Sequence, residues 1–376
     1  MKAVIAVISD LATDMRVRKL AMLMAEEGLD TMVVGRYSGT TLPVTIPRVR
    51  TTTLRVPFRK GPLMYLTFNF FLFFRLLFRG YGIIVASDLD TLVPCYLVSR
   101  LSGAILIYDS HEYFTGQYGL QERPFKHFLW KSAERIVVPR ADHMITVSNS
   151  IGELYRREYG VDPLVIRNVS PDITHLLPHD RGELGASKED LLVIMQGSGL
   201  NEGRGAGQLL AAMNLTERVR LLVVGTGDII ERIRRDASLS PAGSRINFLP
   251  RMPWEEMMRY TMCCDAGLSL DTDTCVNQRY SLPNKFFDYI AAGIPALVSP
   301  LPEVAALVEK YGCGKVLEAV TPEVIARQLQ LLADDPRLLS SLKQNAVEAR
   351  RELHWEREKV REQELVRSII KSKSNR

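Results

Sequence analysis

The sequence lacks several features that would place it in a specialised class. Its 376 residues include five cysteines and no C-x-x-C pair, which argues against both a disulfide framework and a zinc site. An odd number of cysteines suits a reducing compartment, and no signal-peptide apolar core follows the short run Ala3–Ile8. We therefore expect a cytoplasmic protein whose first apolar run is a buried strand.

Long hydrophobic runs and the common nucleotide motifs are also missing. The largest apolar block, Leu63–Phe74, is uncharged for 12 residues, whereas a membrane-spanning helix needs roughly 20. No G-x-G-x-x-G follows the first predicted strand, and no G-x-x-x-x-G-K-[ST] occurs. These absences argue against a membrane-spanning protein, an ordinary dinucleotide enzyme and a P-loop ATPase.

Acidic residues are absent from residues 31–87. This stretch carries eight basic residues and an aromatic-rich segment, Met64–Phe78. Such a segment predicts an in-plane helix on an anionic membrane surface, formed within residues 48–79. The alternative is that Met64–Phe78 packs in the protein core while its arginines extend to solvent. Nucleic-acid binding is disfavoured, because the aromatic residues are not interleaved with polar groups as on an open sheet.

The basic excess of the chain is local. Residues 1–170 contain 21 Lys and Arg against 15 Asp and Glu, while the remaining residues contain 27 against 28. The formal charge of +5 therefore comes from the amino-terminal part of the chain.

Short β-branched runs alternate with helical patterns over most of the chain, which is typical of parallel sheets covered by helices on both faces. The predicted fold class is α/β, with two Rossmann-like doubly wound domains that face each other across a cleft. Open α/β sheets bind ligands at the carboxyl ends of their strands, so we expect the active site there.

A polar stretch with several prolines and glycines separates two runs of this alternation. We expect the first domain over residues 1–170, a linker over 171–190 and the second domain over 191–352. Residues 353–376 mix acidic and basic residues around an apolar stripe, which predicts an exposed helix that crosses back to the first domain.

Three turns in the second half are suited to bind phosphate. Gly197-Ser198-Gly199 follows one predicted strand, Gly225 follows the next, and Leu282-Pro283-Asn284-Lys285 opens a helix. Such turns offer free backbone N–H groups, and Arg204 and Lys285 add positive charge, which together suit a diphosphate. A single Gly-rich turn is more often structural, so the prediction depends on the combination.

The segment from Tyr280 to Pro295 reads Y-S-L-P-N-K-F-F-D-Y-I-A-A-G-I-P. It resembles the PNK-hydrophobic-(F)-E/D-Y-x-x-x-G-x-P signature of the family-4 (group 1) retaining glycosyltransferases, which have the GT-B fold. Further similar segments follow the family's order along nearly the whole chain: Asp14–Arg18, Tyr108–Glu112, Ala141–Ser148, Arg167–Val169, Gly203–Gly205 and Trp355–Glu356. The resemblance implies that the second half holds a nucleotide-diphosphate-sugar donor, that the first half holds the acceptor, and that the anomeric configuration is retained.

The resemblance also implies roles in the donor site. Asp288 falls where the family has the second Glu of an E-x7-E motif, which binds the donor ribose, and Tyr280 replaces the first Glu. Arg204 fills the later of two family cation positions and Ser198 the earlier, so we hypothesise that Lys285 supplies the missing charge. The other donor-binding candidates are Gly197, Gly199, Gly225, Arg251, Met252, Ser281, Leu282, Pro283 and Asn284.

His111 is the first candidate on the acceptor side. It follows a predicted strand, and an ordinary imidazole pKa near ~6.5 would let it bond a sugar hydroxyl or another substrate oxygen. Glu112 either orients this imidazole or caps the next helix. Asp10, Asp14 and Arg16, near the end of the first strand, are acceptor-binding candidates, and Asp14 has the alternative role of a helix N-cap.

The predicted function is a retaining glycosyltransferase that moves a sugar from a UDP-sugar, or from GDP-mannose, to a lipid-linked or growing glycan acceptor. We expect this activity in polysaccharide or glycolipid biosynthesis at the cytoplasmic membrane face, with His111, Arg204 and Lys285 as catalytic residues. No cofactor or metal is expected, since the GT-B architecture typically needs no metal. The resemblance also implies front-face attack, with the departing phosphate oxygen as base. Two alternatives stay open: a GT-B sugar-nucleotide 2-epimerase-like enzyme and a non-catalytic GT-B nucleotide-sugar-binding subunit.

Overall fold

The computed structural model describes residues 1–374 except 10, 12–13, 38–44 and 198. The chain forms two compact units. Unit 1 consists of Met1–Arg167 together with Lys359–Arg376, and unit 2 consists of Asn168–Glu358.

Unit 1 alternates strands and helices along the chain. Its elements are β1 (Lys2–Ala6), α1 (Met15–Glu26), β2 (Asp30–Arg36), β3 (Arg50–Leu54), α2 (Pro62–Leu77), β4 (Ile83–Ser87), α3 (Leu89–Ser102), β5 (Ile105–Ser110), η1 (Phe114–Gly116), α4 (Pro124–Val137), η2 (Val138–Arg140), β6 (His143–Thr146), α5 (Asn149–Tyr159), β7 (Leu164–Val165) and most of α14 (Trp355–Ser374).

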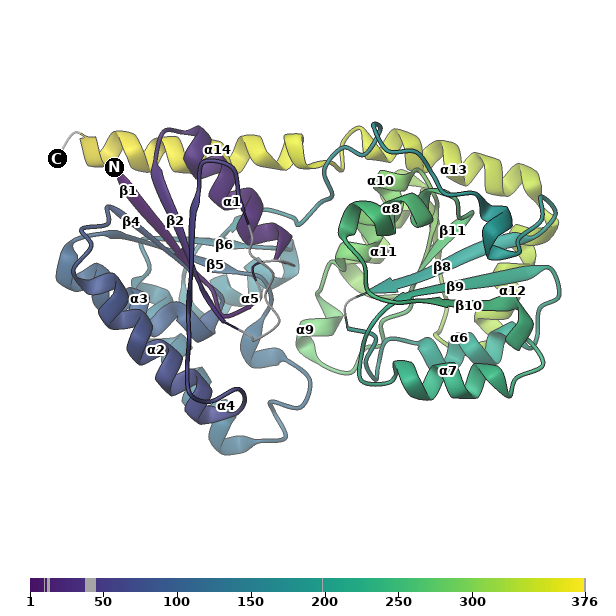
Figure 1. Cartoon of the computed structure of the whole chain (residues 1–376), viewed down its shortest axis with the longest axis horizontal. Helices are drawn as coiled ribbons and strands as arrows, with labels where there is room; N and C mark the ends of the chain where they lie inside the picture. The colour runs from purple at the N-terminus through teal and green to yellow at the C-terminus, as the bar shows by residue number, and fades with distance from the viewer. Residues whose placement is uncertain (10, 12–13, 38–44, 198, 375–376) are drawn as a thin grey trace. The chain divides into compact units, whose positions relative to one another are not determined.

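The strands of unit 1 form a seven-stranded parallel sheet in the order β3-β2-β1-β4-β5-β6-β7. Helices α2, α3 and α4 cover one face of this sheet and α1 covers the other (Figure 1). The central strands are apolar on both faces, and Ala3–Ala6 and Ile83–Ala86 are completely buried.

Unit 2 repeats the same plan. Its elements are η3 (Arg181–Leu184), β8 (Leu191–Gly197), α6 (Ala206–Met213), β9 (Val219–Gly225), α7 (Ile230–Ser238), η4 (Gly243–Arg245), β10 (Ile246–Leu249), α8 (Trp254–Met262), β11 (Ala266–Ser269), α9 (Val276–Arg279), α10 (Asn284–Ala292), β12 (Ala296–Val298), α11 (Pro302–Tyr311), β13 (Gly314–Val316), α12 (Pro322–Asp334) and α13 (Pro336–Arg350).

The sheet of unit 2 is parallel, in the order β10-β9-β8-β11-β12-β13. Both sheets therefore have the Rossmann order, in which the direction of winding reverses beside the first strand of the unit. The reversal lies between β1 and β4 in unit 1 and between β8 and β11 in unit 2. Ligand sites are expected at the carboxyl ends of these strands.

Strand β3 and residues 171–190 are among the segments that differ from the sequence-based expectation. Strand β3 was not predicted, because its sequence Arg-Thr-Thr-Thr-Leu is polar and it forms a sheet edge paired with β2. The stretch 171–190, predicted as a linker, instead packs within unit 2, where Ile173, Leu184 and Ala186 are buried.

The closing helix α14 packs on unit 1 through its residues from Lys359 onward. Lys359 Nζ lies 2.7 Å from Glu26 Oε2, and Arg367 Nε lies 2.7 Å from Glu27 Oε2. Val366 and Ile369 are each 1% exposed, so an apolar stripe of α14 is fully covered. Among the helices of the described residues, none has both the length and the hydropathy to cross a membrane.

Candidate active site

The Gly-rich turns of unit 2 bring two loops together at the carboxyl edge of its sheet. β8 ends at Gly197 and β9 ends at Gly225, and these two residues are paired in the sheet. A Cβ on Gly225 would lie 1.8 Å from the carbonyl oxygen of Gly197, and Gly225 has a φ of 131°. Only glycine tolerates this approach. Gly199 belongs to the same loop, and the candidate Ser198 lies outside the described residues.

Arg204 and Lys285 meet at one buried carboxylate, that of Asp271. Lys285 Nζ lies 3.0 Å from Asp271 Oδ2, and an Arg204 Nη1–H donates to Asp271 Oδ1. The exposed fraction of the side chain is 1% for Asp271, 11% for Lys285 and 35% for Arg204. The structure therefore brings together the two cations that the sequence placed on separate loops.

The group has a net positive charge. Burial raises the pKa of Asp271, but the charges of Lys285 and Arg204 outweigh burial and hold that pKa below its ordinary value. Two cations and one carboxylate leave one positive charge. Lys285 also lies in the first turn of α10, where backbone N–H groups without helical partners add positive potential. This arrangement can bind an anion such as a diphosphate.

Asp288, predicted to bind ribose, holds several parts of unit 2 together. Its Oδ1 accepts hydrogen bonds from Ser170 Oγ at 2.7 Å and from Trp254 Nε1 at 3.0 Å, and its Oδ2 accepts one from Gln196 Nε2 at 3.0 Å. A carboxylate has about four accepting positions, so most of the accepting capacity of Asp288 is used inside the unit.

The candidates before α10 form its entry turn. Pro283 is the N-cap residue of α10 rather than a residue of its first turn. Ser281 Oγ donates to the carbonyl oxygen of Gln278 at 3.0 Å, and Asn284 Oδ1 accepts a hydrogen bond from Asn168 Nδ2 at 3.1 Å. These contacts fix the backbone that carries Lys285.

The remaining donor candidates differ in burial. Leu282 is buried in the core of unit 2, Met252 packs against that core, and Tyr280 is half-buried. Arg251 is exposed and follows the end of β10, so its backbone also lies at the carboxyl edge of the sheet.

In unit 1, His111 lies between two carboxylates. Its Nε2 is 3.1 Å from Asp109 Oδ2, and its Nδ1 is 3.4 Å from Asp88 Oδ2. The backbone N–H of His111 donates to Asp88 Oδ1 at 2.9 Å. Asp109 is in β5 and Asp88 directly follows β4, so the group lies at the carboxyl edge of the unit 1 sheet.

The two carboxylates change the chemistry expected of the imidazole. Burial lowers the pKa of His111, but Asp88 and Asp109 outweigh burial and raise that pKa to about 10. Burial raises the pKa of Asp88 to about 7, and the charge of His111 limits this rise. The expected pKa of His111 near ~6.5 is therefore wrong, and the ring is an imidazolium at neutral pH.

Asp88 also has an unusual backbone conformation. Its φ is 64° and its ψ is 167°, a region that residues other than glycine rarely enter. Its backbone N–H donates to the carbonyl oxygen of Asp109 at 2.9 Å, which holds the two acidic residues side by side. Strain of this kind is concentrated at functional sites.

The acceptor-side candidates occupy different places. Asp14 is the N-cap of α1, where its Oδ1 accepts a hydrogen bond from the backbone N–H of Val17 at 3.0 Å. Arg16 is 6% exposed, and its Nη2 lies 2.6 Å from Asp109 Oδ1. The guanidinium of Arg16 therefore acts on the site through Asp109 instead of reaching a substrate directly. Asp10 lies outside the described residues.

Glu112 does not orient the imidazole as expected. Its carboxylate accepts a hydrogen bond from Gln117 Nε2, while both ring nitrogens of His111 contact the other two carboxylates. Burial raises the pKa of Asp109, but Arg16 and His111 hold it well below its ordinary range. The orienting role therefore belongs to Asp88 and Asp109, because these residues follow the neighbouring strands.

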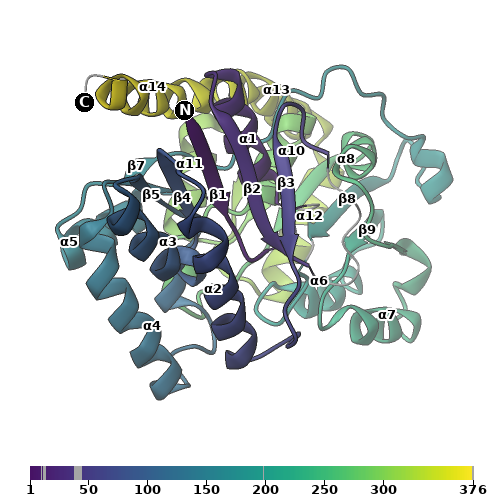
Figure 2. The ribbon, with the colours of Figure 1, turned by 60° about the vertical axis from the view of Figure 1, so that its left-hand side comes forward.

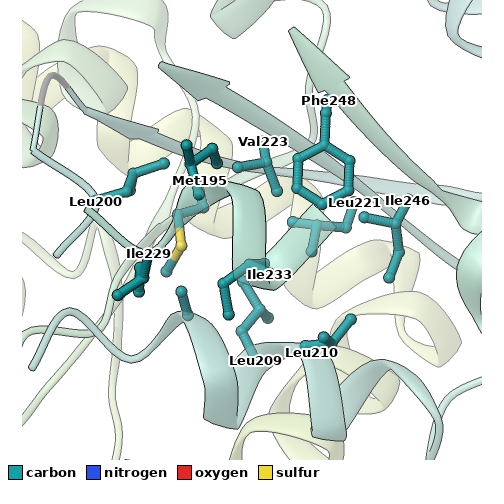
Figure 3. A pocket seen from close by; sticks show the side chains of 12 residues that line it. Met195, Leu200, Leu209, Leu210, Leu221, Val223, Ile229, Ile233, Ile246 and Phe248 are labelled. Carbon is teal, nitrogen blue, oxygen red and sulfur yellow. The ribbon is translucent and has the colours of Figure 1, made fainter. Parts of the chain in front are cut away.

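Figure 3 shows a pocket in unit 2. The described residues that line it are apolar, including Met195, Ile233 and Phe248, and they come from the sheet, from α6 and α7, and from the loops that hold Leu200 and Ile229. Such a lining has no group to recognise phosphate or ribose, so the pocket is part of the packed core.

Sequence reasoning missed Asp88 and did not join Asp271 to the cations. Asp88 directly follows the apolar run of β4, so the expectation that ligands bind at the carboxyl ends of strands could have placed it near His111. Asp271 follows a predicted strand in the same way. The contact of Asp88 with His111 and that of Asp271 with Arg204 join residues that are distant along the chain. No local sequence pattern therefore predicts them.

Comparison with known proteins agrees with this architecture. Residues 13–171 match the family model described as a glycosyl transferase 4-like domain. Sucrose-phosphate synthase from Thermosynechococcus elongatus has a similar structure, with a TM-score of 0.82 and 17% identity over 99% of this chain and 100% of that chain. Anabaena Alr3699/HepE in complex with UDP-glucose has a TM-score of 0.74 and 15% identity, over 99% and 100% of the two chains. WaaG, a glycosyltransferase involved in lipopolysaccharide biosynthesis, has a TM-score of 0.73 and 13% identity, over 98% and 99%.

No protein with a curated description matches the sequence. The family model assigns residues 13–171 to the glycosyl transferase 4-like domains, and the solved structures share the two-unit fold over nearly the whole chain. The chain thus has a glycosyl transferase 4-like domain over residues 13–171 and the two-domain GT-B fold over nearly its whole length, which supports the predicted enzymatic activity. The predicted class of two parallel-sheet α/β domains is confirmed, and the match over residues 13–171 agrees with the resemblance to family-4 glycosyltransferases.

Proposed function

We propose that this enzyme is a retaining glycosyltransferase that uses a UDP-sugar donor. The observation that carries the proposal is the pair of cations, Arg204 and Lys285, at the carboxyl edge of the unit 2 sheet. A departing diphosphate gains negative charge as the sugar leaves, and fixed cations beside a helix start stabilise that charge. The HepE structures contain UDP, UDP with glucose, or UDP-glucose, which supports UDP rather than GDP.

In this proposal unit 2 holds the donor and unit 1 holds the acceptor. Arg204 and Lys285 bind the diphosphate, and the carboxylate of Asp288 serves the ribose, as the family resemblance implies. The acceptor hydroxyl oxygen forms a bond to the anomeric carbon while the bond from that carbon to the phosphate oxygen breaks. The hydroxyl proton passes to the departing phosphate oxygen on the same face, which retains the configuration. His111 is an imidazolium and does not take this proton.

We further propose that the acceptor is a lipid-linked or growing glycan in polysaccharide or glycolipid biosynthesis at the cytoplasmic membrane face. The support is an exposed apolar face on helices α2 and α4, which are labelled in Figure 2. The rings of Tyr65 on α2 and Trp130 on α4 are 5.5 Å apart. Each residue of this apolar face is at least half exposed: Leu63, Leu66, Phe70, Phe74, Phe78, Phe125, Phe128 and Leu129.

The apolar face is flanked by positive charge. Arg59 and Lys60 precede α2, Arg79 follows it, and Arg123 precedes α4, and all four are exposed. Exposed aromatic and aliphatic side chains next to basic residues suit an anionic bilayer surface. The opposite side of α2 packs in the core, where Met64, Phe68, Leu72 and Leu76 are buried, so core packing and a membrane contact belong to different sides of one helix.

The donor assignment is tested by incubating the protein with UDP-sugars and with GDP-mannose, with and without a membrane lipid extract. We expect transfer of sugar to the extract from a UDP-sugar and a retained configuration in the product. Lys285→Ala and Arg204→Ala should each weaken binding of UDP, as calorimetry can measure, whereas unchanged binding in Lys285→Ala would remove Lys285 from the phosphate site. Transfer should persist with EDTA, because no metal is expected.

The same incubation separates the two alternatives. A sugar-nucleotide 2-epimerase would change the donor without any lipid extract and would form no glycan product. A non-catalytic subunit would bind UDP and leave the donor intact. Either outcome would overturn the proposed transfer.

A further inference from the structure

We propose that Asp271 is a positioning residue that acts as an internal counter-ion of the phosphate site and limits how tightly the site holds a nucleoside diphosphate. This inference rests on the proposed function. It starts from the geometry: one carboxylate, 1% exposed, binds both cations, with Lys285 Nζ on Oδ2 and Arg204 Nη1 on Oδ1. Ser269 Oγ also donates to Asp271 Oδ2 at 3.3 Å.

The backbone fixes this pairing. Thr272 donates to the carbonyl oxygen of Gly203 through its backbone N–H at 2.9 Å and through its Oγ1 at 3.0 Å. A Cβ on Gly205 would lie 2.5 Å from Leu270, and Gly205 has a φ of 73°. Gly203 and Gly205, the neighbours of Arg204, thus pack against Thr272 and Leu270, the neighbours of Asp271. Main-chain packing therefore holds the two loops that carry Arg204 and Asp271 against each other.

The negative charge of Asp271 weakens the attraction of the site for a diphosphate. Without Asp271, two cations would meet the diphosphate with their full attraction, whereas with it the ligand meets one net positive charge. The carboxylate also repels the diphosphate directly, because it lies within a few ångströms of both cations. The same cations must bind the donor and release the nucleoside diphosphate product. A buried counter-ion weakens the hold on the product while keeping both cations in position.

The test is the affinity for UDP, measured by calorimetry on the full chain. We expect Asp271→Asn to bind UDP about tenfold more tightly than the wild type, as one removed unit charge near the ligand would give. Asp273→Asn is the matched control, because Asp273 lies in the same loop but is exposed and pairs with Arg279 at 2.8 Å. Its affinity for UDP should equal that of the wild type.

A charge rescue keeps the inference testable if Asp271→Asn folds poorly. Lys285→Met leaves Arg204 and Asp271 with no net charge and should weaken UDP binding. The double variant with Lys285→Met and Asp271→Asn restores one net positive charge and should regain at least part of the lost affinity. A purely structural role of Asp271 predicts further loss in the double variant instead.

The results distinguish a failure of the counter-ion role of Asp271 from a failure of the proposed function. Equal or weaker UDP binding by a folded Asp271→Asn variant, or a double variant no tighter than Lys285→Met, would overturn the counter-ion role and leave the proposed function standing. A wild type that binds neither UDP nor GDP would overturn the proposed function, and the counter-ion role with it.

Discussion

At the scale of single residues, His111 gives the stability of the protein a testable dependence on pH. Its pKa is raised to about 10 in the folded protein, while an unfolded imidazole has a pKa near ~6.5. The folded state therefore binds this proton more tightly than the unfolded state. The resulting stabilisation is fully present below pH ~6.5 and is lost as the pH rises toward the folded pKa.

We expect the free energy of unfolding of the wild type to fall between pH 7.5 and 10, with a slope from His111 of at most about 1.4 kcal/mol per pH unit. His111→Gln should remove this part of the slope, as urea denaturation at several pH values can measure. His143→Gln is the control, because burial lowers the pKa of His143 and leaves it neutral in this range. Equal slopes in the wild type and His111→Gln would show that the carboxylates do not hold the ring as an imidazolium.

The sequence could supply the individual site residues but not their contacts. Arg204, Lys285 and His111 follow predicted strands or open a predicted helix, so their general location was predictable. The partners that set their charge are remote: Asp88 is 23 residues from His111, and Asp271 is 67 residues from Arg204. Only the packing of neighbouring strands brings such residues together.

At the scale of elements, α2 shows why hydrophobic periodicity alone was ambiguous. One side of the helix, with Met64, Phe68 and Leu72, is buried, and the other side, with Leu66 and Phe70, is exposed. Both sides are apolar, so the pattern has no polar stripe to mark the solvent side. The sequence predicted the helix and its apolar character, and the structure supplied the orientation.

The apolar face gives a prediction for binding to vesicles. The wild type should sediment with vesicles that contain anionic phospholipid, and the double variant with Leu66→Glu and Phe70→Glu should bind at least tenfold more weakly. The reason is that each apolar side chain buried in the interface contributes roughly 1.5–3 kcal/mol when fully covered, and the added acids are repelled by the anionic lipid.

Leu239→Glu is the matched control, because Leu239 is 81% exposed on unit 2, away from α2 and α4 in the sequence. This variant should sediment like the wild type. Failure of the folded wild type to bind anionic vesicles would exclude the membrane contact, and a similar loss in all variants would show that the apolar face is not the contact.

At the scale of the whole molecule, unit 1 is discontinuous in sequence, since it contains Met1–Arg167 and Lys359–Arg376. The alternation of strands and helices was enough to predict two α/β halves. The partners of the closing helix had no such signal, because Glu27 and Arg367 are separated by 340 residues.

Removal of residues 359–376 should destabilise unit 1 selectively. The deletion uncovers the apolar surface under Val366 and Ile369 and breaks the ion pairs with Glu26 and Glu27. Hydrogen exchange should become faster in β1, α1 and β2, while the strands of unit 2 serve as an internal control and stay protected. Unchanged exchange in α1 would show that α14 contributes little to unit 1.

This arrangement has a consequence for biosynthesis. The ribosome makes the amino-terminal sheet first, and domains usually fold in the order in which they are made. Here the first unit to emerge is the last to be completed, because its covering helix α14 is translated only after all of unit 2. A nascent chain therefore exposes the surface under α14 until that helix has left the ribosome, which happens only after all of unit 2 has emerged.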